Sequence, residues 1–337
     1  MAAPSASIFG VLGPALTQAE RAFLREADPW GFILFARNIE SPAQVAALVA
    51  GLREAVGRNA PVLIDQEGGR VARLRPPHWR GWRPVAHLFD GRAEAEAREA
   101  LRLRYRIIAA ELAALGIDVN CMPLLDLPVP GSHDVIGARA LGTEPAPVAA
   151  RARVVCEALR EGGVLPVVKH LPGHGRATVD SHEGLPRVAT DLATLDATDF
   201  EAFRPLAGEV LGMTAHIVYE AVDPDACATL SPACIRLIRE RIGFEGCLMT
   251  DDLSMHALAG PMGARAGAAL AAGCDLILHC NGEMAEMEAI AAATPGLAGA
   301  ALARADRALA ARRAPGSFDA DDAHARYLAL TGEAAHA

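Results

Sequence analysis

Eight short apolar runs recur along the chain, and helical patterns lie between them. The runs are largely continuous in their apolar residues, which is typical of strands buried on both faces of a parallel sheet. They cover residues 7–13, 31–36, 61–66, 117–126, 164–171, 210–217, 246–252 and 274–280. Strands that alternate with helices in this way predict an α/β fold.

Two of the intervening segments carry complete helix signals. Residues 41–57 begin with Ser-Pro and end with Gly, and residues 231–243 repeat this design. Serine caps a helix N-terminus, proline fits the first turn, and glycine tolerates the left-handed residue that ends many helices. Two further helices are predicted to end at Gly116 and Gly162.

The eight strand–helix units favour a single-domain (β/α)8 TIM-like barrel over an open, doubly wound sheet. The reason is that polar residues recur where the runs end, and in a barrel all strand ends meet at one mouth. These residues include Asp65, Asp126, Lys169, His216 and Asp251. No Pro-, Gly- or Ser-rich linker divides the chain, so residues 1–337 are predicted to form one domain with a short C-terminal helical tail.

Charge and composition exclude several classes of partner. The chain has 32 basic and 41 acidic residues, which argues against binding to nucleic acid or to an anionic membrane. The basic run at residues 98–106 is interpreted as a solvated helix face. We expect no signal peptide and no membrane span, and the seven cysteines contain no C-x-x-C pair. These features predict a cytoplasmic protein with reduced core thiols.

The segment at residues 63–74 places Asp65 at a strand end, before a Gly-Gly turn and two arginines, Arg70 and Arg73. An aspartate at a barrel mouth can accept hydrogen bonds from neighbouring hydroxyls, and an arginine can donate several. The same residues also fit an ion pair that only closes a loop. Arg139 follows the fourth run in a Gly-flanked loop and by itself fits a solvated side chain.

Residues 168–182 concentrate titratable groups directly after a strand. Lys169 and His170 end the run, His174 lies in the turn that follows, and Asp180 precedes His182 by two residues. An aspartate that accepts from one imidazole nitrogen fixes the tautomer and raises the basicity of the other nitrogen. The spacing matches no zinc motif. A polar loop without catalytic function remains an alternative for each histidine.

Two adjacent carboxylates, Asp251 and Asp252, end the seventh run. Adjacent strand residues point to opposite sides, so one can face the barrel axis while the other supports a loop. A carboxylate that points into the mouth can act as nucleophile or base. The alternative is that both cap the helix that follows.

Taken together, six ordered segments resemble the family 3 glycoside hydrolases, and within them the single-domain NagZ-type β-N-acetylhexosaminidases. The segments are GFILFARNI, LIDQEGGRVARL, VIGARALG, VVKHLPGHG with DSH, MTAHIVY and LIRERIGFEGCLMTDDLSM, between residues 31 and 255. The resemblance implies a TIM-like barrel and a retaining mechanism. It identifies Asp251 as the nucleophile and His182, paired with Asp180, as the acid/base.

The resemblance also implies a substrate. Enzymes of this group remove β-linked GlcNAc from 1,6-anhydro-MurNAc, with or without its peptide, during cell-wall recycling in the bacterial cytoplasm. No cofactor and no metal are expected. The residues that correspond to the GlcNAc subsite are Asp65, Arg73, Arg139, Lys169 and His170.

Two other functions stay open at this stage. One is a metal-dependent TIM-barrel hydrolase that uses His170, His174, His216 and Asp251. The other is a sugar-binding barrel without activity, which the filled nucleophile and acid/base positions disfavour.

Overall fold

The computed structural model describes residues 3–333, and its centre is a parallel sheet of nine strands. The strands lie in the order β5-β4-β3-β2-β1-β11-β10-β8-β6. Their bounds are β1 Ser5–Gly10, β2 Pro29–Leu34, β3 Val62–Ile64, β4 Val119–Asn120, β5 Leu165–Pro166, β6 Val168–Leu171, β8 Leu211–Thr214, β10 Cys247–Asp252 and β11 Leu276–His279.

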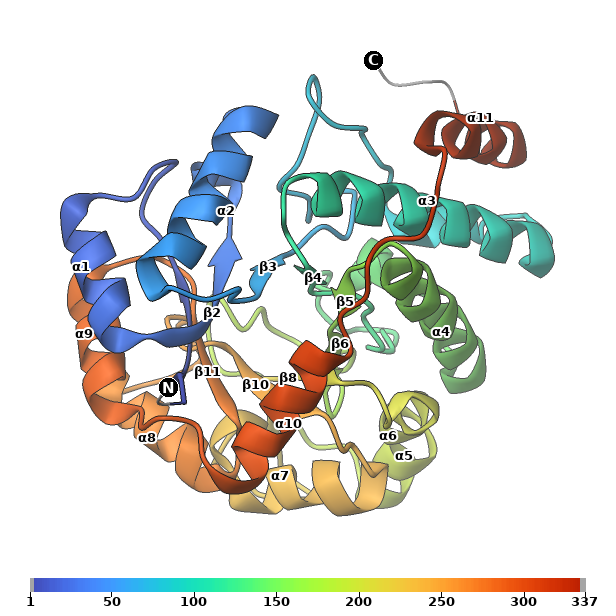
Figure 1. Cartoon of the computed structure of the whole chain (residues 1–337). Helices are drawn as coiled ribbons and strands as arrows, with labels where there is room; N and C mark the ends of the chain where they lie inside the picture. Colours follow the sequence, from blue (N-terminus) through green and yellow to red (C-terminus); the bar gives the residue numbers. More distant parts are fainter. Residues whose placement is uncertain (1–2, 334–337) are drawn as a thin grey trace.

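The two end strands of this sheet, β5 and β6, are consecutive in the chain and separated only by Val167. The two edges of the sheet are therefore formed by one continuous segment of the chain. The sheet curls into a nearly closed barrel surrounded by helices (Figure 1). The barrel predicted from the eight apolar runs is confirmed. The fifth run, residues 164–171, supplies both β5 and β6, which is why eight runs give nine strands.

A second, two-stranded parallel sheet pairs β7, Arg187–Val188, with β9, Val218–Tyr219. The sequence pattern did not predict it. It lies directly after the segment that carries Asp180 and His182 and ties the far end of that segment to the loop after β8.

The helices surround the barrel. They are α1 Gln18–Ala27, α2 Pro42–Val56, α3 Glu94–Ala114, α4 Pro145–Glu161, α5 Leu192–Ala197, α6 Asp199–Phe203, α7 Pro232–Leu237, α8 Met262–Ala272, α9 Met284–Ala293, α10 Gly299–Ala310 and α11 Ala320–Thr331. The predicted caps are present, because the Ser41 and Ser231 side chains accept from backbone N–H groups of the first turns of α2 and α7. Gly57 ends α2 with a φ of 64°.

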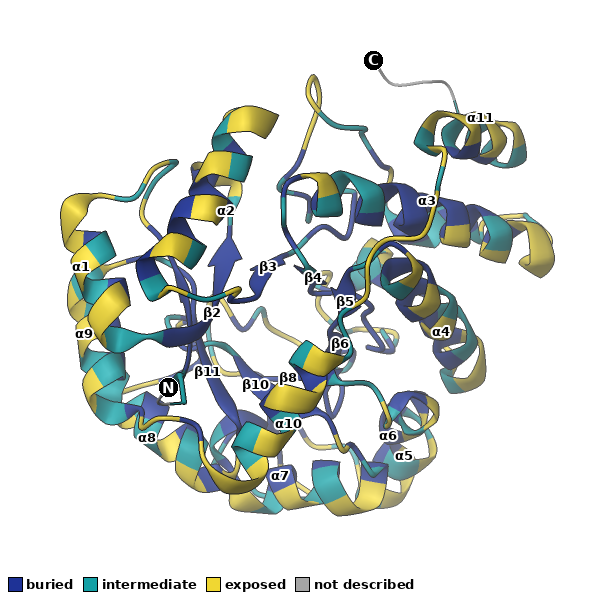
Figure 2. Cartoon of the chain, viewed as in Figure 1, coloured by how far each residue is buried: buried dark blue, intermediate teal, exposed yellow. Residues whose placement is uncertain are grey.

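The core has two parts, one inside the barrel and one between the barrel and the helices. Figure 2 shows the strands buried and the helices exposed only on their outer faces. The interior part includes Leu297, Ala305 and Ala308, so α10 and Leu297, two residues before it, pack against the barrel interior. Arg304 of α10 donates to Asp275, the residue before β11, which holds this helix where the strands begin.

The predicted C-terminal helical tail is α11, which packs against α3 (Figure 1). Tyr327 of α11 makes an edge contact with Trp82 at 5.2 Å between ring centroids. The interpretation of residues 98–106 as a solvated face is wrong for its second half, because Arg104 and Arg106 are buried. Arg104 instead donates to the backbone oxygen of Glu67 at 2.7 Å and so supports the strand end that carries Asp65.

Between residues 3 and 333, no helix combines the length and the apolar character that crossing a bilayer requires.

Candidate active site

A pocket lies at the carboxyl ends of the barrel strands, where most of the residues predicted for the site meet. The predicted residues that line it are Asp65, Arg73, Arg139, Lys169, His170, His182 and Asp251. Asp180 does not line the pocket but contacts His182. The apolar part of the wall includes Phe35, Val71, Met213 and Met255. The fold therefore brings together residues that lie up to 186 positions apart in the sequence, from Asp65 to Asp251.

One wall of the pocket is an ion-pair network around Lys169. Its ammonium group lies 2.9 Å from Asp65 Oδ1, while Arg73 Nη2 donates to Asp65 Oδ2 at 3.2 Å. Burial by itself would raise the pKa of Asp65, but Lys169 and Arg73 outweigh it and hold that pKa well below its usual value. The pKa of Lys169 is raised, because its two carboxylate partners outweigh burial. Both groups are therefore charged at neutral pH.

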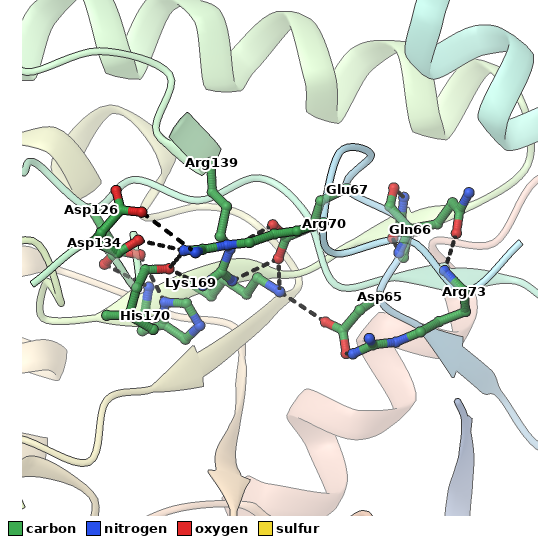
Figure 3. Close-up of polar contacts among 12 residues, drawn as sticks. Asp65, Gln66, Glu67, Arg70, Arg73, Asp126, Asp134, Arg139, Lys169 and His170 are labelled. Carbon is green, nitrogen blue, oxygen red and sulfur yellow. Dashed lines mark hydrogen bonds and ion pairs between the residues drawn. The ribbon is translucent and has the colours of Figure 1, made fainter. Parts of the chain in front are cut away.

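Glu67 joins this network and was missed in the sequence. Its side chain is 2% exposed, lies 2.8 Å from Lys169 Nζ, and accepts from Arg139 Nε and Nη2, each at 2.8 Å. Figure 3 shows how these charged side chains contact one another, from Arg139 through Glu67 and Lys169 to Asp65. Its spacing from Asp65 could have indicated Glu67 in the sequence. Residues two positions apart in an extended segment point to the same side, so a residue two positions after Asp65 can face the same pocket.

A second missed residue is Asp126, which is fully buried beside His170. Its Oδ2 lies 2.7 Å from His170 Nδ1, and its Oδ1 accepts from the backbone N–H groups of His170 and His174 at 3.2 and 2.6 Å. Burial opposes the charged form of Asp126, but His170 and the other donors outweigh it and lower the pKa to about 2. The peptide bond between Lys169 and His170 is cis, and both side chains line the pocket.

The two adjacent carboxylates at the end of β10 have different surroundings. Asp251 lines the pocket, and its Oδ1 accepts from the backbone N–H of Asp252 at 2.8 Å. Burial raises the pKa of Asp251, but His170 and His216 outweigh it, so the net pKa is lowered and the carboxylate is ionised. Asp252 also borders the pocket, but its carboxylate accepts from Ser254 and from the backbone N–H of Cys280.

The segment between β6 and β7 carries the histidine–aspartate pair to the pocket rim. His182 Nδ1 lies 2.8 Å from Asp180 Oδ1, which also accepts from the His182 backbone N–H at 2.9 Å. The His182 side chain is 70% exposed, so its other nitrogen is open to solvent and to a ligand. Ser181 turns the opposite way and is buried, with its hydroxyl 3.2 Å from His174 Nε2.

Three of the four residues of the metal-site alternative have other hydrogen-bond partners. His170 contacts Asp126 through Nδ1, and His174 contacts Ser181 through Nε2. His216 contacts Thr229 and the backbone oxygen of Asp252. Across residues 3–333, no group of three or more His, Cys, Asp or Glu side chains has an arrangement that could hold a metal ion. The geometry therefore gives this alternative no support.

His174 makes the stability of the fold depend on pH. Burial, and then the neighbouring His170, lower its pKa from 6.5 to about 4. Between these values the unfolded chain binds a proton that the folded chain does not, so stability is complete above pH 6.5 and falls towards pH 4. From pH 7.5 to pH 5 we expect His174 to account for a loss of about 2 kcal/mol in the free energy of unfolding.

The measurement is urea unfolding of the wild type and of His174→Gln at both pH values. The variant should lose less stability on acidification than the wild type, because its side chain does not titrate. His256→Gln serves as the control, since His256 is exposed and should leave the difference between the two pH values unchanged. An equal pH dependence in His174→Gln and wild type would show that folding does not lower the pKa of His174.

Comparison with known proteins gives a consistent result. Residues 6–308 match the family described as glycosyl hydrolase family 3 N terminal domain. A β-hexosaminidase from Alkalilimnicola ehrlichii is 41% identical over 283 residues, which cover 81% of this chain and 80% of the relative. Native NagZ from Neisseria gonorrhoeae superimposes with a TM-score of 0.87 at 30% identity, over 98% of both chains.

The structure of the same Neisseria protein in complex with N-trifluoroacetyl-D-glucosamine superimposes with a TM-score of 0.86 at 29% identity, again over 98% of both chains. Family match, relatives and fold agree over most of the length of the chain. The chain therefore belongs to glycosyl hydrolase family 3 and is a glycoside hydrolase similar to the β-hexosaminidases.

Proposed function

We propose that the chain is a retaining exo-β-N-acetylglucosaminidase with Asp251 as the nucleophile and His182, oriented by Asp180, as the acid/base. The observation that carries the proposal is that one pocket combines an ionised carboxylate with an exposed histidine–aspartate pair. Asp65, Arg73, Arg139, Lys169 and His170 form the wall that would hold the terminal sugar.

The proposed substrate is a terminal GlcNAc linked β-1,4 to 1,6-anhydro-MurNAc, with or without a peptide, in cytoplasmic peptidoglycan recycling. Three lines support it. The sequence resembles the enzymes of this group, the relatives are β-hexosaminidases, and the Neisseria protein binds a glucosamine derivative. All seven cysteines are buried and free, which suits a reducing compartment.

In the first step, the Asp251 carboxylate attacks the anomeric carbon while His182 protonates the departing oxygen. The transition state resembles an oxocarbenium ion, and a retaining mechanism passes through a covalent glycosyl-enzyme. The lowered pKa of Asp251 keeps the attacking group ionised at neutral pH. The Asp252 N–H donates to Oδ1, whereas Oδ2 has no hydrogen bond to any described residue.

In the second step, neutral His182 takes a proton from water, and the water displaces Asp251 from the sugar. Imidazole fits both steps because its unperturbed pKa of ~6.5 lets it donate and accept near neutral pH. A neutral base also avoids a second anion beside the glycosyl ester. Asp180 accepts from Nδ1, which directs the other nitrogen to the reaction.

The reaction class is tested by hydrolysis of 4-nitrophenyl N-acetyl-β-glucosaminide beside the corresponding glucoside. We expect turnover of the first and little of the second, and retention at the anomeric carbon by NMR. Full activity in the presence of a chelator is expected and would eliminate the metal-dependent alternative. Absence of turnover by the folded wild type would contradict the proposal.

Replacing Asp65 by alanine should weaken transition-state binding. The change removes an acceptor from the wall and leaves Lys169 and Arg73 without one of their partners. We expect a loss of roughly 2–4 kcal/mol of transition-state stabilisation, the usual cost of leaving a buried charge unpaired. The ratio of kcat/KM between wild type and Asp65→Ala on the chromogenic substrate measures this loss. An unchanged kcat/KM would place Asp65 outside the subsite.

A further inference from the structure

The buried contact between Asp126 and His170 points to a role that the proposed mechanism does not use. Asp126 is fully buried, accepts two backbone N–H groups at Oδ1, and has Oδ2 2.7 Å from His170 Nδ1. Two backbone N–H donors hold the carboxylate in its ionised form, which only accepts hydrogen bonds. The ring nitrogen that faces it, His170 Nδ1, must therefore carry a proton.

This arrangement determines what His170 offers to the pocket. In a neutral imidazole one nitrogen carries the proton and the other is an acceptor. When the ring is neutral, a proton on Nδ1 leaves Nε2 with its lone pair, and among the described residues no hydrogen bond reaches Nε2. His170 lines the pocket, so the acceptor is available to a ligand there.

The neighbouring residue supplies the complementary donor. The Lys169 ammonium group has three protons, and two of them face Asp65 at 2.9 Å and Glu67 at 2.8 Å. One proton is left, and Lys169 also lines the pocket. The pair thus presents one donor and one acceptor side by side, which matches a hydroxyl group because a hydroxyl both accepts and donates.

We propose that Asp126 is a positioning residue that fixes the Nδ1–H tautomer of His170, so that Lys169 and His170 together select a hydroxyl of the sugar. The consequence for the reaction rests on the proposed function, whereas the tautomer itself does not. Asp126 does not line the pocket and acts through His170.

The substitution Asp126→Asn tests this directly, because the structure determines how an asparagine would lie. Both backbone N–H groups donate to Oδ1, so this position must remain an oxygen. The amide nitrogen would then take the place of Oδ2, facing His170 Nδ1. An amide N–H can only donate, so Nδ1 would have to accept and the proton would move to Nε2.

The readout is the protonation of each ring nitrogen, from NMR of protein labelled with ¹⁵N-histidine, at pH 8 and without ligand. In the wild type we expect His170 to be protonated on Nδ1 and bare on Nε2. In Asp126→Asn we expect the reverse. A wild-type spectrum with a proton on Nε2 overturns the proposal, and this result does not depend on whether the variant folds or whether the enzyme is active.

Kinetics show whether the tautomer matters for the reaction. We expect kcat/KM of Asp126→Asn on 4-nitrophenyl N-acetyl-β-glucosaminide to fall roughly 10- to 100-fold, by analogy with the loss of a partner that orients a metal-bound histidine. A reversed tautomer with unchanged kcat/KM would overturn the selection of a hydroxyl. If the wild type does not cleave this substrate, the proposed function fails, while the NMR result still decides the role of Asp126.

Glu286→Gln is the matched control. Glu286 contacts Nε2 of another buried histidine, His279, at 2.8 Å, so the change alters a second histidine–carboxylate pair outside the pocket lining. The His170 signals should stay in place, and kcat/KM should stay within about twofold of wild type, as for substitutions away from a site. A shift of the His170 tautomer in this control would show that the effect of Asp126→Asn is not specific.

Discussion

Replacing Asp251 by alanine is expected to abolish turnover while the fold is retained. The carboxylate forms the covalent bond in the proposed mechanism, and alanine offers no atom to replace it. We expect kcat to fall by at least about 10⁴-fold, in the range found when a nucleophile is removed from a hydrolase. Alanine should be tolerated because, within residues 3–333, the Asp251 side chain makes a single hydrogen bond, which comes from the backbone of its neighbour.

Two measurements complete the test. Circular dichroism should show the wild-type spectrum for the variant, and a mechanism-based fluorosugar should label a wild-type peptide that contains Asp251. The adjacent Asp252→Asn is the control. It should keep more activity but lose stability, because Asp252 holds Ser254 and Cys280 in place. Loss of activity in Asp252→Asn with near-normal rates in Asp251→Ala would reverse the assignment.

The removal of His182 should affect the two chemical steps unequally. An activated nitrophenol leaves without help from an acid, whereas a natural sugar does not, so the first step should survive only on the activated substrate. The second step needs a base in both cases, and general acid–base catalysis typically contributes about 10²- to 10⁴-fold. His182→Ala should therefore show a burst of nitrophenol followed by slow turnover, as the glycosyl-enzyme accumulates.

An external nucleophile separates a chemical role from a structural one. Azide needs no base, so it should restore turnover of His182→Ala and give the β-glycosyl azide. Asp180→Ala should show a weaker version, because the imidazole remains but loses its partner at 2.8 Å. Equal losses on good and poor leaving groups, without a burst or an azide product, would show that the acid/base lies elsewhere.

A matched control for this experiment is present in the chain. His87 and Asp90 form another exposed histidine–aspartate pair, with Nδ1 and Oδ2 3.1 Å apart, and neither residue lines the pocket. His87→Ala should show no burst and no response to azide. A burst in this variant would mean that the kinetic signature does not report on the active site.

Local signals in the sequence were enough to predict the barrel, the C-terminal ends of four helices and most of the charged residues that line the pocket. These features follow from local signals, since apolar runs predict buried strands and a capping serine or terminal glycine acts on its own helix. The carboxyl ends of parallel strands meet at one mouth, so strand-end residues such as Asp65, Lys169 and Asp251 could be expected to lie together. Their catalytic and binding roles remain predictions.

The pairing and the burial of the polar side chains, in contrast, became visible only in the folded structure. Glu67 and Arg139 are 72 residues apart, and Asp126 and His170 are 44 apart, so no local pattern records these contacts. The same holds for the burial of Arg104, which depends on how α3 packs. A charged side chain is stable in the interior only when partners surround it, and closure of the barrel supplies those partners from distant strands.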